Sequence, residues 1–165
     1  MKIKNIVLFA LIFVLAYLSV WFAFSIVMTW LQWQFHELRW LTPMMDNRNP
    51  SMAGAILCFA GIYQFTPLKN ACLSRCRSPL GFLLNEWRDG TGGAFGMGFR
   101  HGALCLGCCW AQMLVMFAVG VMSLAGMIWI TSLTVMEKWV FADPKWVITI
   151  SGMALIAWGL YRLCL

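Results

Sequence analysis

The length of its uncharged stretches is the feature that most restricts what this chain can fold into. No charged side chain occurs over the 35 residues from Gly102 to Met136, and a second uncharged run extends from Asn5 to Phe35. A helix that crosses the bilayer core needs about 20 apolar residues. A soluble domain would have about a quarter of its residues charged, whereas here the charged fraction is 11%. We therefore expect an integral membrane protein.

The first uncharged run could be mistaken for a secretory signal, because Lys2 and Lys4 precede it. The apolar region of a signal peptide is only about 7–15 residues long. The run here is far longer, and no A-x-A-like cleavage site follows it before Gln32. It therefore predicts a mature transmembrane helix.

The sequence predicts an all-α fold: one polytopic transmembrane helical bundle, residues 1–165, with about five spans. As a single helix the run from Gly102 would be about 52 Å long, so we divide it near Gly120 and Gly126. A single strongly tilted helix is the alternative. The expected spans are 6–30, 51–66, 100–119, 122–140 and 146–163, and the cysteine-containing connection 68–98 is expected to be a cytoplasmic loop.

The basic residues indicate the orientation of these spans. With a cytoplasmic N-terminus, all of the 12 lysines and arginines except Arg39, Arg48 and Arg162 lie on the cytoplasmic side, as the positive-inside bias requires. This predicts a multi-pass membrane protein with a cytoplasmic N-terminus. The same placement explains the net charge of +6 without a nucleic-acid partner.

A histidine and five cysteines form the most informative chemical pattern. His101, Cys105 and Cys108 follow i, i+4, i+7 spacing, which places them on one helix face. Cys108 lies about 10 Å deeper than His101, so one metal cannot bind the whole stripe. A second half-site is expected from Cys72 and Cys76. The candidate metal ligands are Cys72, Cys76, His101, Cys105, Cys108 and Cys109.

The donor types indicate a soft metal. Cytoplasmic thiols stay reduced, so metal binding or redox chemistry is favoured over structural disulfides. Thiolates and thioethers favour Cu(I), with zinc as the second choice. Six methionines are the best-placed additional thioethers: Met44, Met45, Met97, Met113, Met116 and Met122. We expect metal handling or delivery rather than catalysis, since no nucleophile–base pair is evident. Two alternatives remain, an accessory subunit of a membrane metalloenzyme and a thiol–disulfide oxidoreductase.

Other residues are expected to have structural roles. Cys58 and Cys164, each alone in its span, are predicted to pack as small apolar side chains. Glu137 is predicted to form an interfacial ion pair with the adjacent Lys138, with an ion or proton relay as the alternative. The glycines at positions 96, 98, 102 and 107 are predicted to let helices approach closely.

Two long motifs resemble those of a known family. They are YQFTPLKNACLSRCRSPLGFLL, Tyr63–Leu84, and GMGFRHGALCLGCCWAQM, Gly96–Met113. The chain resembles a bacterial domain-of-unknown-function family of predicted metal-binding integral membrane proteins, from roughly Trp21 to the C-terminus. The resemblance implies the same six metal ligands and a location in the bacterial inner membrane. Family members usually carry a further methionine-rich helix before the first span. We therefore expect either a short form, or a form that relies on partner subunits or a second copy of itself for the missing packing surface.

Overall fold

Every regular element in the described part of the chain is helical. The computed structural model describes residues 3–38, 49–120, 123–140 and 145–164. Its elements are α1 (Ile3–Glu37), α2 (Pro50–Gln64), α3 (Pro67–Cys76), α4 (Pro79–Asn85), α5 (Gly90–Val119), α6 (Leu124–Val135), the π-helical segment η1 (Met136–Val140) and α7 (Lys145–Leu163). The predicted all-α class is confirmed.

Prolines begin three of these helices. The side chains of Asn49, Thr66 and Ser78 accept hydrogen bonds from the first turns of α2, α3 and α4, and each helix has proline in its first turn. Proline suits this position because its fixed φ matches a helix and its missing N–H would have no partner there. The connection expected as a loop over 68–98 is thus largely helical, and α5 starts well before the predicted position 100. The loop prediction was wrong.

The long uncharged run divides where the sequence predicted. Helix α5 ends at Val119, and Gly120 follows with φ of 102°, a conformation that only glycine adopts without strain. The side chain of Ser123 then caps α6 by accepting from the N–H of Gly126. Residues 102–136 therefore form two helices rather than one tilted helix.

Among the residues that the structure describes, three helices are long and apolar enough to cross a membrane. They are residues 6–37 of α1, together with α5 and α7. Helices α2 and α3 meet at an angle of 67° and make a fourth candidate if the bent pair counts as one span. The expected number of about five spans is not confirmed by this criterion.

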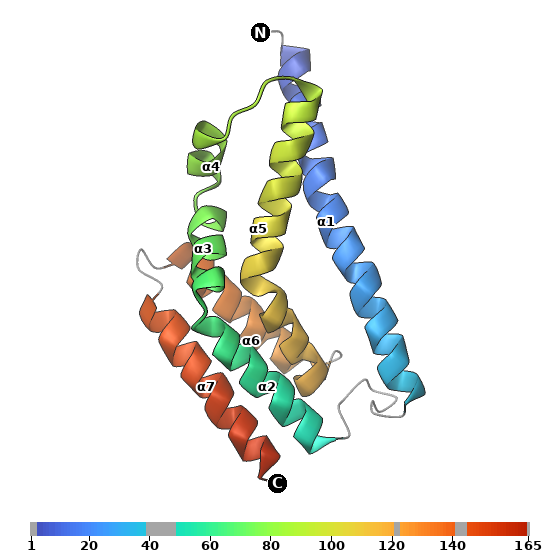
Figure 1. Cartoon of the computed structure of the whole chain (residues 1–165), viewed down its shortest axis with the longest axis vertical. Coiled ribbons are helices and arrows are strands. Elements are labelled where there is room, and N and C mark those ends of the chain that lie inside the picture. The colour runs from blue at the N-terminus through green and yellow to red at the C-terminus, as the bar shows by residue number, and fades with distance from the viewer. Residues whose placement is uncertain (1–2, 39–48, 121–122, 141–144, 165) are drawn as a thin grey trace.

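The helices form two close pairs joined through the middle of the molecule. Helix α1 lies along α5, α2 lies along α7, and α3 packs against α5 (Figure 1). The N- and C-termini lie at opposite ends of the long axis (Figure 1). Glycine makes the first pairing possible, because a Cβ at Gly98 would collide with the backbone of Phe13. Helix α1 therefore lies close enough to bring its side chains to the centre of α5.

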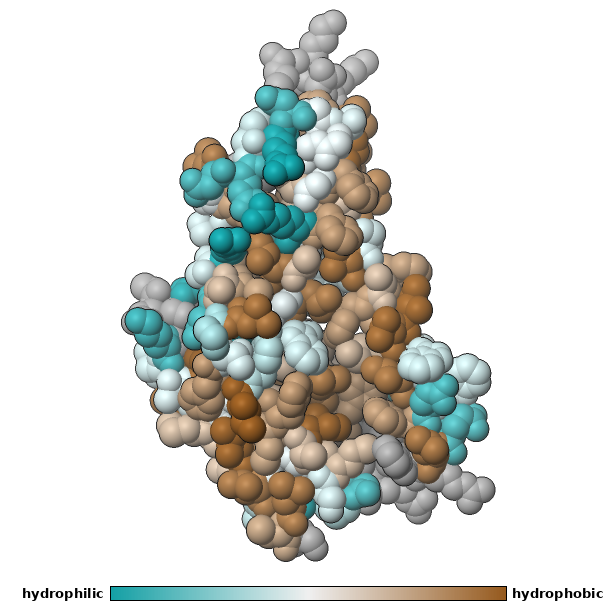
Figure 2. All heavy atoms as spheres, in the orientation of Figure 1, coloured by the Kyte–Doolittle hydropathy of each residue, from teal (hydrophilic) through white to brown (hydrophobic). Residues whose placement is uncertain are grey.

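The outer surface is largely apolar. Side chains such as Leu15 and Phe22, exposed at 64% and 67%, point away from the core. In Figure 2 hydrophobic residues cover much of the lower face, and hydrophilic residues gather over α4 and the start of α5. Such a surface fits the predicted contact with lipid.

Candidate metal site

The two predicted half-sites come together between α3 and α5. Cys72, Cys108 and Cys109 belong to one buried cluster, and Cys76 packs against it. The Cys72 sulfur lies against the backbone at Gly107 of α5, where no side chain separates the two helices. The crossing of α3 over α5 thus places five cysteines in one region, the thiol cluster, which consists of Cys72, Cys76, Cys105, Cys108 and Cys109.

Cys105 is the centre of the thiol cluster. Its sulfur accepts hydrogen bonds from the hydroxyl of Tyr17 and from Nζ of Lys138, each at 3.4 Å. Cys76 of α3 packs against the buried cluster that contains Cys72, Cys108 and Cys109. Helix α1 and the segment η1 therefore converge on this sulfur, and α3 brings Cys76 to the cluster around it.

His101 lies one turn before Cys105 in an aromatic surrounding. Its ring centroid is 6.0 Å from those of Phe13 and Tyr17 and 5.1 Å from that of Phe82. Its Nδ1 atom is buried without a hydrogen-bond partner. A buried polar atom without a partner costs about 1–3 kcal/mol. A ligand at this nitrogen would remove that cost, so His101 fits the role of a metal donor.

The thiols do not yet converge on a single point. Within the residues that the structure describes, no three His, Cys, Asp or Glu side chains are arranged to hold one metal ion. The thiols of Cys108 and Cys109 instead donate to the carbonyl oxygen of Cys105, at 3.0 and 3.1 Å. Metal binding by these two residues requires rotation of their side chains. The donor set itself, thiols with one imidazole, fits a soft metal.

A buried ion pair, which the sequence did not predict, adjoins the thiol cluster. Glu137 is 2% exposed and pairs with Lys69, which is fully buried, at 2.8 Å between Oε2 and Nζ. The amide nitrogens of Gln64 and Gln112 each donate to Oε1 of Glu137 at 3.0 Å. Gln64 also donates to Ser151 on α7. The predicted interfacial pair of Glu137 with Lys138 is therefore wrong.

In the π-helical turn η1, the consecutive residues Glu137 and Lys138 point to different regions. Glu137 points into the ion-pair network, whereas Lys138 reaches the sulfur of Cys105. Such π-helical turns are often found at functional sites. One signal for the network was available in the sequence, because Gln112 continues the His101, Cys105 and Cys108 stripe at the same helical spacing.

The remaining cysteines and methionines lie apart or play smaller roles. Cys58 packs against Gly159 of α7, as predicted, but Cys164 is exposed. Met113 packs against the thiol cluster. Of the other methionines considered as ligands, Met44, Met45 and Met122 lie outside the described residues.

Comparison with known families identifies the chain. The family model described as PpoB2, a copper chaperone, matches residues 4–162. The chain belongs to this copper chaperone family. Membership supports copper as the bound metal, as the thiol-rich donor set predicted. No curated protein and no solved structure matches the chain.

Proposed function

We propose that this protein is a membrane-embedded copper chaperone that binds Cu(I) at the thiol cluster and hands it to a partner. The observation that carries the proposal is the meeting of α3 and α5 thiols in one buried region of a chain from a copper chaperone family. Cysteine sulfur is among the preferred ligands of Cu(I). The cluster offers more sulfurs than one such ion needs.

The proposed first ligands are Cys76 and Cys105, which come from different helices and belong to the same thiol cluster. Cys72, Cys108, Cys109 and His101 complete the proposed donor set. Surplus donors favour delivery over storage, because copper can move by exchanging one sulfur for the next. Each exchange keeps the ion coordinated, so no step requires a bare cation in a buried place.

We also propose that the chain crosses the bacterial inner membrane about five times with a cytoplasmic N-terminus. The chain direction supports this, because the termini lie at opposite ends of the molecule (Figure 1). This topology is tested by adding a membrane-impermeant thiol reagent to intact cells and measuring whether the exposed Cys164 becomes labelled. Labelling only after the inner membrane is opened would contradict a periplasmic C-terminus.

The copper proposal is tested on the whole chain, purified in detergent without oxygen. Competition with a chromophoric Cu(I) chelator measures affinity and stoichiometry, and X-ray absorption identifies sulfur ligands. We expect tight binding of at least one Cu(I) per chain, weakened about 100-fold or more by Cys76→Ser and by Cys105→Ser. This corresponds to about 2.8 kcal/mol for one lost sulfur ligand.

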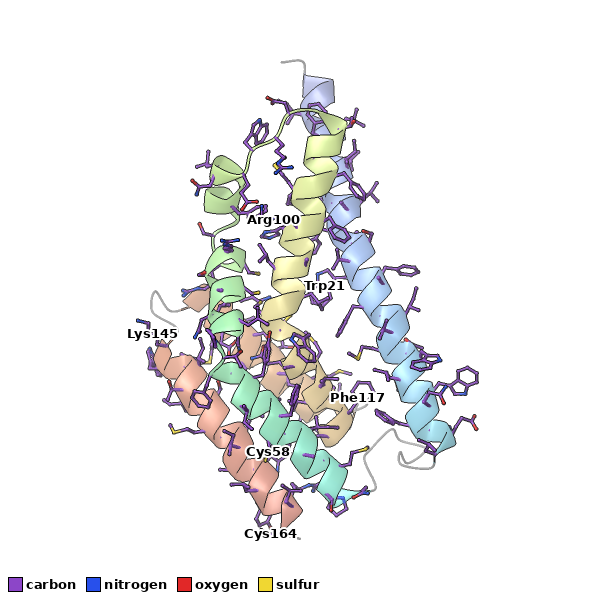
Figure 3. All side chains as sticks on the ribbon, viewed as in Figure 1. Trp21, Cys58, Arg100, Phe117, Lys145 and Cys164 are labelled. Carbon is purple, nitrogen blue, oxygen red and sulfur yellow. The ribbon has the colours of Figure 1, made fainter. Side chains whose placement is uncertain are left out.

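Two cysteines outside the cluster provide matched controls. Cys58 lies on the side of α2 that faces α7, and Cys164 lies at the C-terminal end (Figure 3). We expect Cys58→Ser and Cys164→Ser to bind copper like the unmodified chain. Equal affinities for all four serine variants would overturn the proposed site. Loss of binding together with a disulfide between α3 and α5 would instead favour a thiol–disulfide oxidoreductase.

A further inference from the structure

The charged side chains described beside the thiol cluster leave one positive charge without a negative partner. Lys69 and Glu137 form a buried pair, so their charges cancel. Lys138 is partly buried and directs its ammonium group to the sulfur of Cys105 at 3.4 Å. This arrangement leaves a positive charge beside the cluster, opposite the sulfur that we assign as a copper ligand.

We propose that Lys138 balances the charge of the loaded site and thereby selects Cu(I) held by two thiolates over a divalent ion. The inference rests on the proposed function. Binding forms two copper–sulfur bonds, and the two displaced thiol protons leave to water, with no change of oxidation state. The product carries one negative charge, which the ammonium group of Lys138 neutralises. The same two thiolates around Zn²⁺ form a neutral complex, so Lys138 contributes little to its stability.

The fold holds Lys138 in this position from both sides. Its neighbour Glu137 accepts hydrogen bonds from Lys69, Gln64 and Gln112, which fixes the π-helical turn. The carbonyl oxygen of Lys138 accepts from Nε of Arg77 on the α3 side at 3.4 Å. A charge that is fixed before binding loses little conformational freedom when copper arrives. The ion-pair network thus positions Lys138, and Lys138 acts on the site.

The test compares Cu(I) and Zn²⁺ affinities of Lys138→Gln and Lys138→Arg in the purified whole chain. We expect Lys138→Gln to weaken Cu(I) binding about 10- to 100-fold, as loss of one nearby charge predicts. Its Zn²⁺ affinity should stay within about threefold of the unmodified chain. Lys138→Arg keeps the charge and should restore most of the Cu(I) affinity.

A cation outside the cluster is the control for general electrostatics. Lys145 is exposed at the start of α7 (Figure 3), and at 0.15 M salt an exposed charge is screened within about 8 Å. We expect Lys145→Gln to leave both affinities unchanged. Thermal unfolding of each variant is measured alongside, to separate selectivity from damage to the fold.

The outcomes distinguish this inference from the function on which it rests. If the unmodified chain fails to bind Cu(I), both are overturned. If it binds Cu(I) and loses binding in Cys105→Ser, but Lys138→Gln behaves normally, only the role of Lys138 is overturned. Equal weakening of Cu(I) and Zn²⁺, or no recovery in Lys138→Arg, would likewise reject charge-based selection.

Discussion

Two buried polar regions lie side by side in this molecule, and they are built in opposite ways. In the ion-pair network the carboxylate of Glu137 accepts from Lys69, Gln64 and Gln112. In the thiol cluster the hydrogen-bond donors are weak, and two thiols donate to the Cys105 carbonyl oxygen. Beside the cluster, Nδ1 of His101 has no partner. The charge-assisted hydrogen bonds of the network are strong and hold helices together, although Oε1 of Gln112 has no partner there. The weakly bonded donors of the cluster stay available to a ligand. We therefore expect the first region to stabilise the fold and the second to bind the ligand.

The largest expected effect comes from breaking the ion-pair network on one side. Glu137→Leu leaves the buried ammonium group of Lys69 without a counter-charge. Removing one partner of a buried pair costs about 3–5 kcal/mol. We expect a loss of this size in the free energy of unfolding, measured by denaturant titration in detergent.

The double variant Lys69→Met/Glu137→Leu is the matched control for that loss. It removes both charges and should recover most of the stability, because no unpaired charge remains. If the double variant is as unstable as Glu137→Leu alone, the pair is not the unit that holds these helices together.

Copper should act on the other region and add stability to it. An ion that links α3 to α5 binds only the folded chain, which gives about 2.7 kcal/mol at a free Cu(I) concentration of 100 times Kd. We expect this gain in thermal unfolding of the unmodified chain and its absence in Cys76→Ser. The gain should persist in Lys69→Met/Glu137→Leu, provided that variant folds. Its loss there would mean that the two regions are not independent.

The features that could be predicted from the sequence are those with local patterns. Uncharged runs predicted the helices, and Gly120 marked the division between α5 and α6. Helical spacing grouped His101, Cys105 and Cys108. Cys72 and Cys76 were predicted as the second half-site because they supply further thiol ligands. These inferences needed only periodicity and residue type.

The ion-pair network could not be predicted from local sequence patterns, because its partners are far apart in the sequence. Adjacency suggested that Glu137 pairs with Lys138, but consecutive residues on a helix do not face each other. The actual partner, Lys69, comes from α3, a helix that we expected to be part of a loop. Helix α3 begins at Pro67, and proline is common in the first turn of a helix.

A pair of glycines on α5 tests how far the position of α1 controls the thiol cluster. A Cβ at Gly98 would strike the backbone of Phe13, whereas a Cβ at Gly96 meets nothing within 4 Å. Gly96 was expected to permit close approach and does not. We expect Gly96→Ala to stabilise the chain by up to about 1 kcal/mol and Gly98→Ala to destabilise it by about 1–3 kcal/mol.

Gly98→Ala should also weaken copper binding, because displacing α1 moves the hydroxyl of Tyr17 away from Cys105. Thermal unfolding and chelator competition on both variants measure the two effects. Effects of the same sign on stability for the two alanine variants would show that the close contact of α1 with α5 does not control the site.

We expect substitution of His101 to have the smallest effect on stability. The same substitution separates a role in packing from a role in copper binding. His101→Phe places a similar ring among Phe13, Tyr17 and Phe82 and removes the unpartnered Nδ1 atom. Without copper, the variant should be more stable by about 1 kcal/mol, the lower range of the cost of such an atom. Its Cu(I) affinity should fall, because phenylalanine has no nitrogen to donate. A variant that gains stability and keeps full copper affinity would make His101 a packing residue and restrict copper coordination to the cysteines.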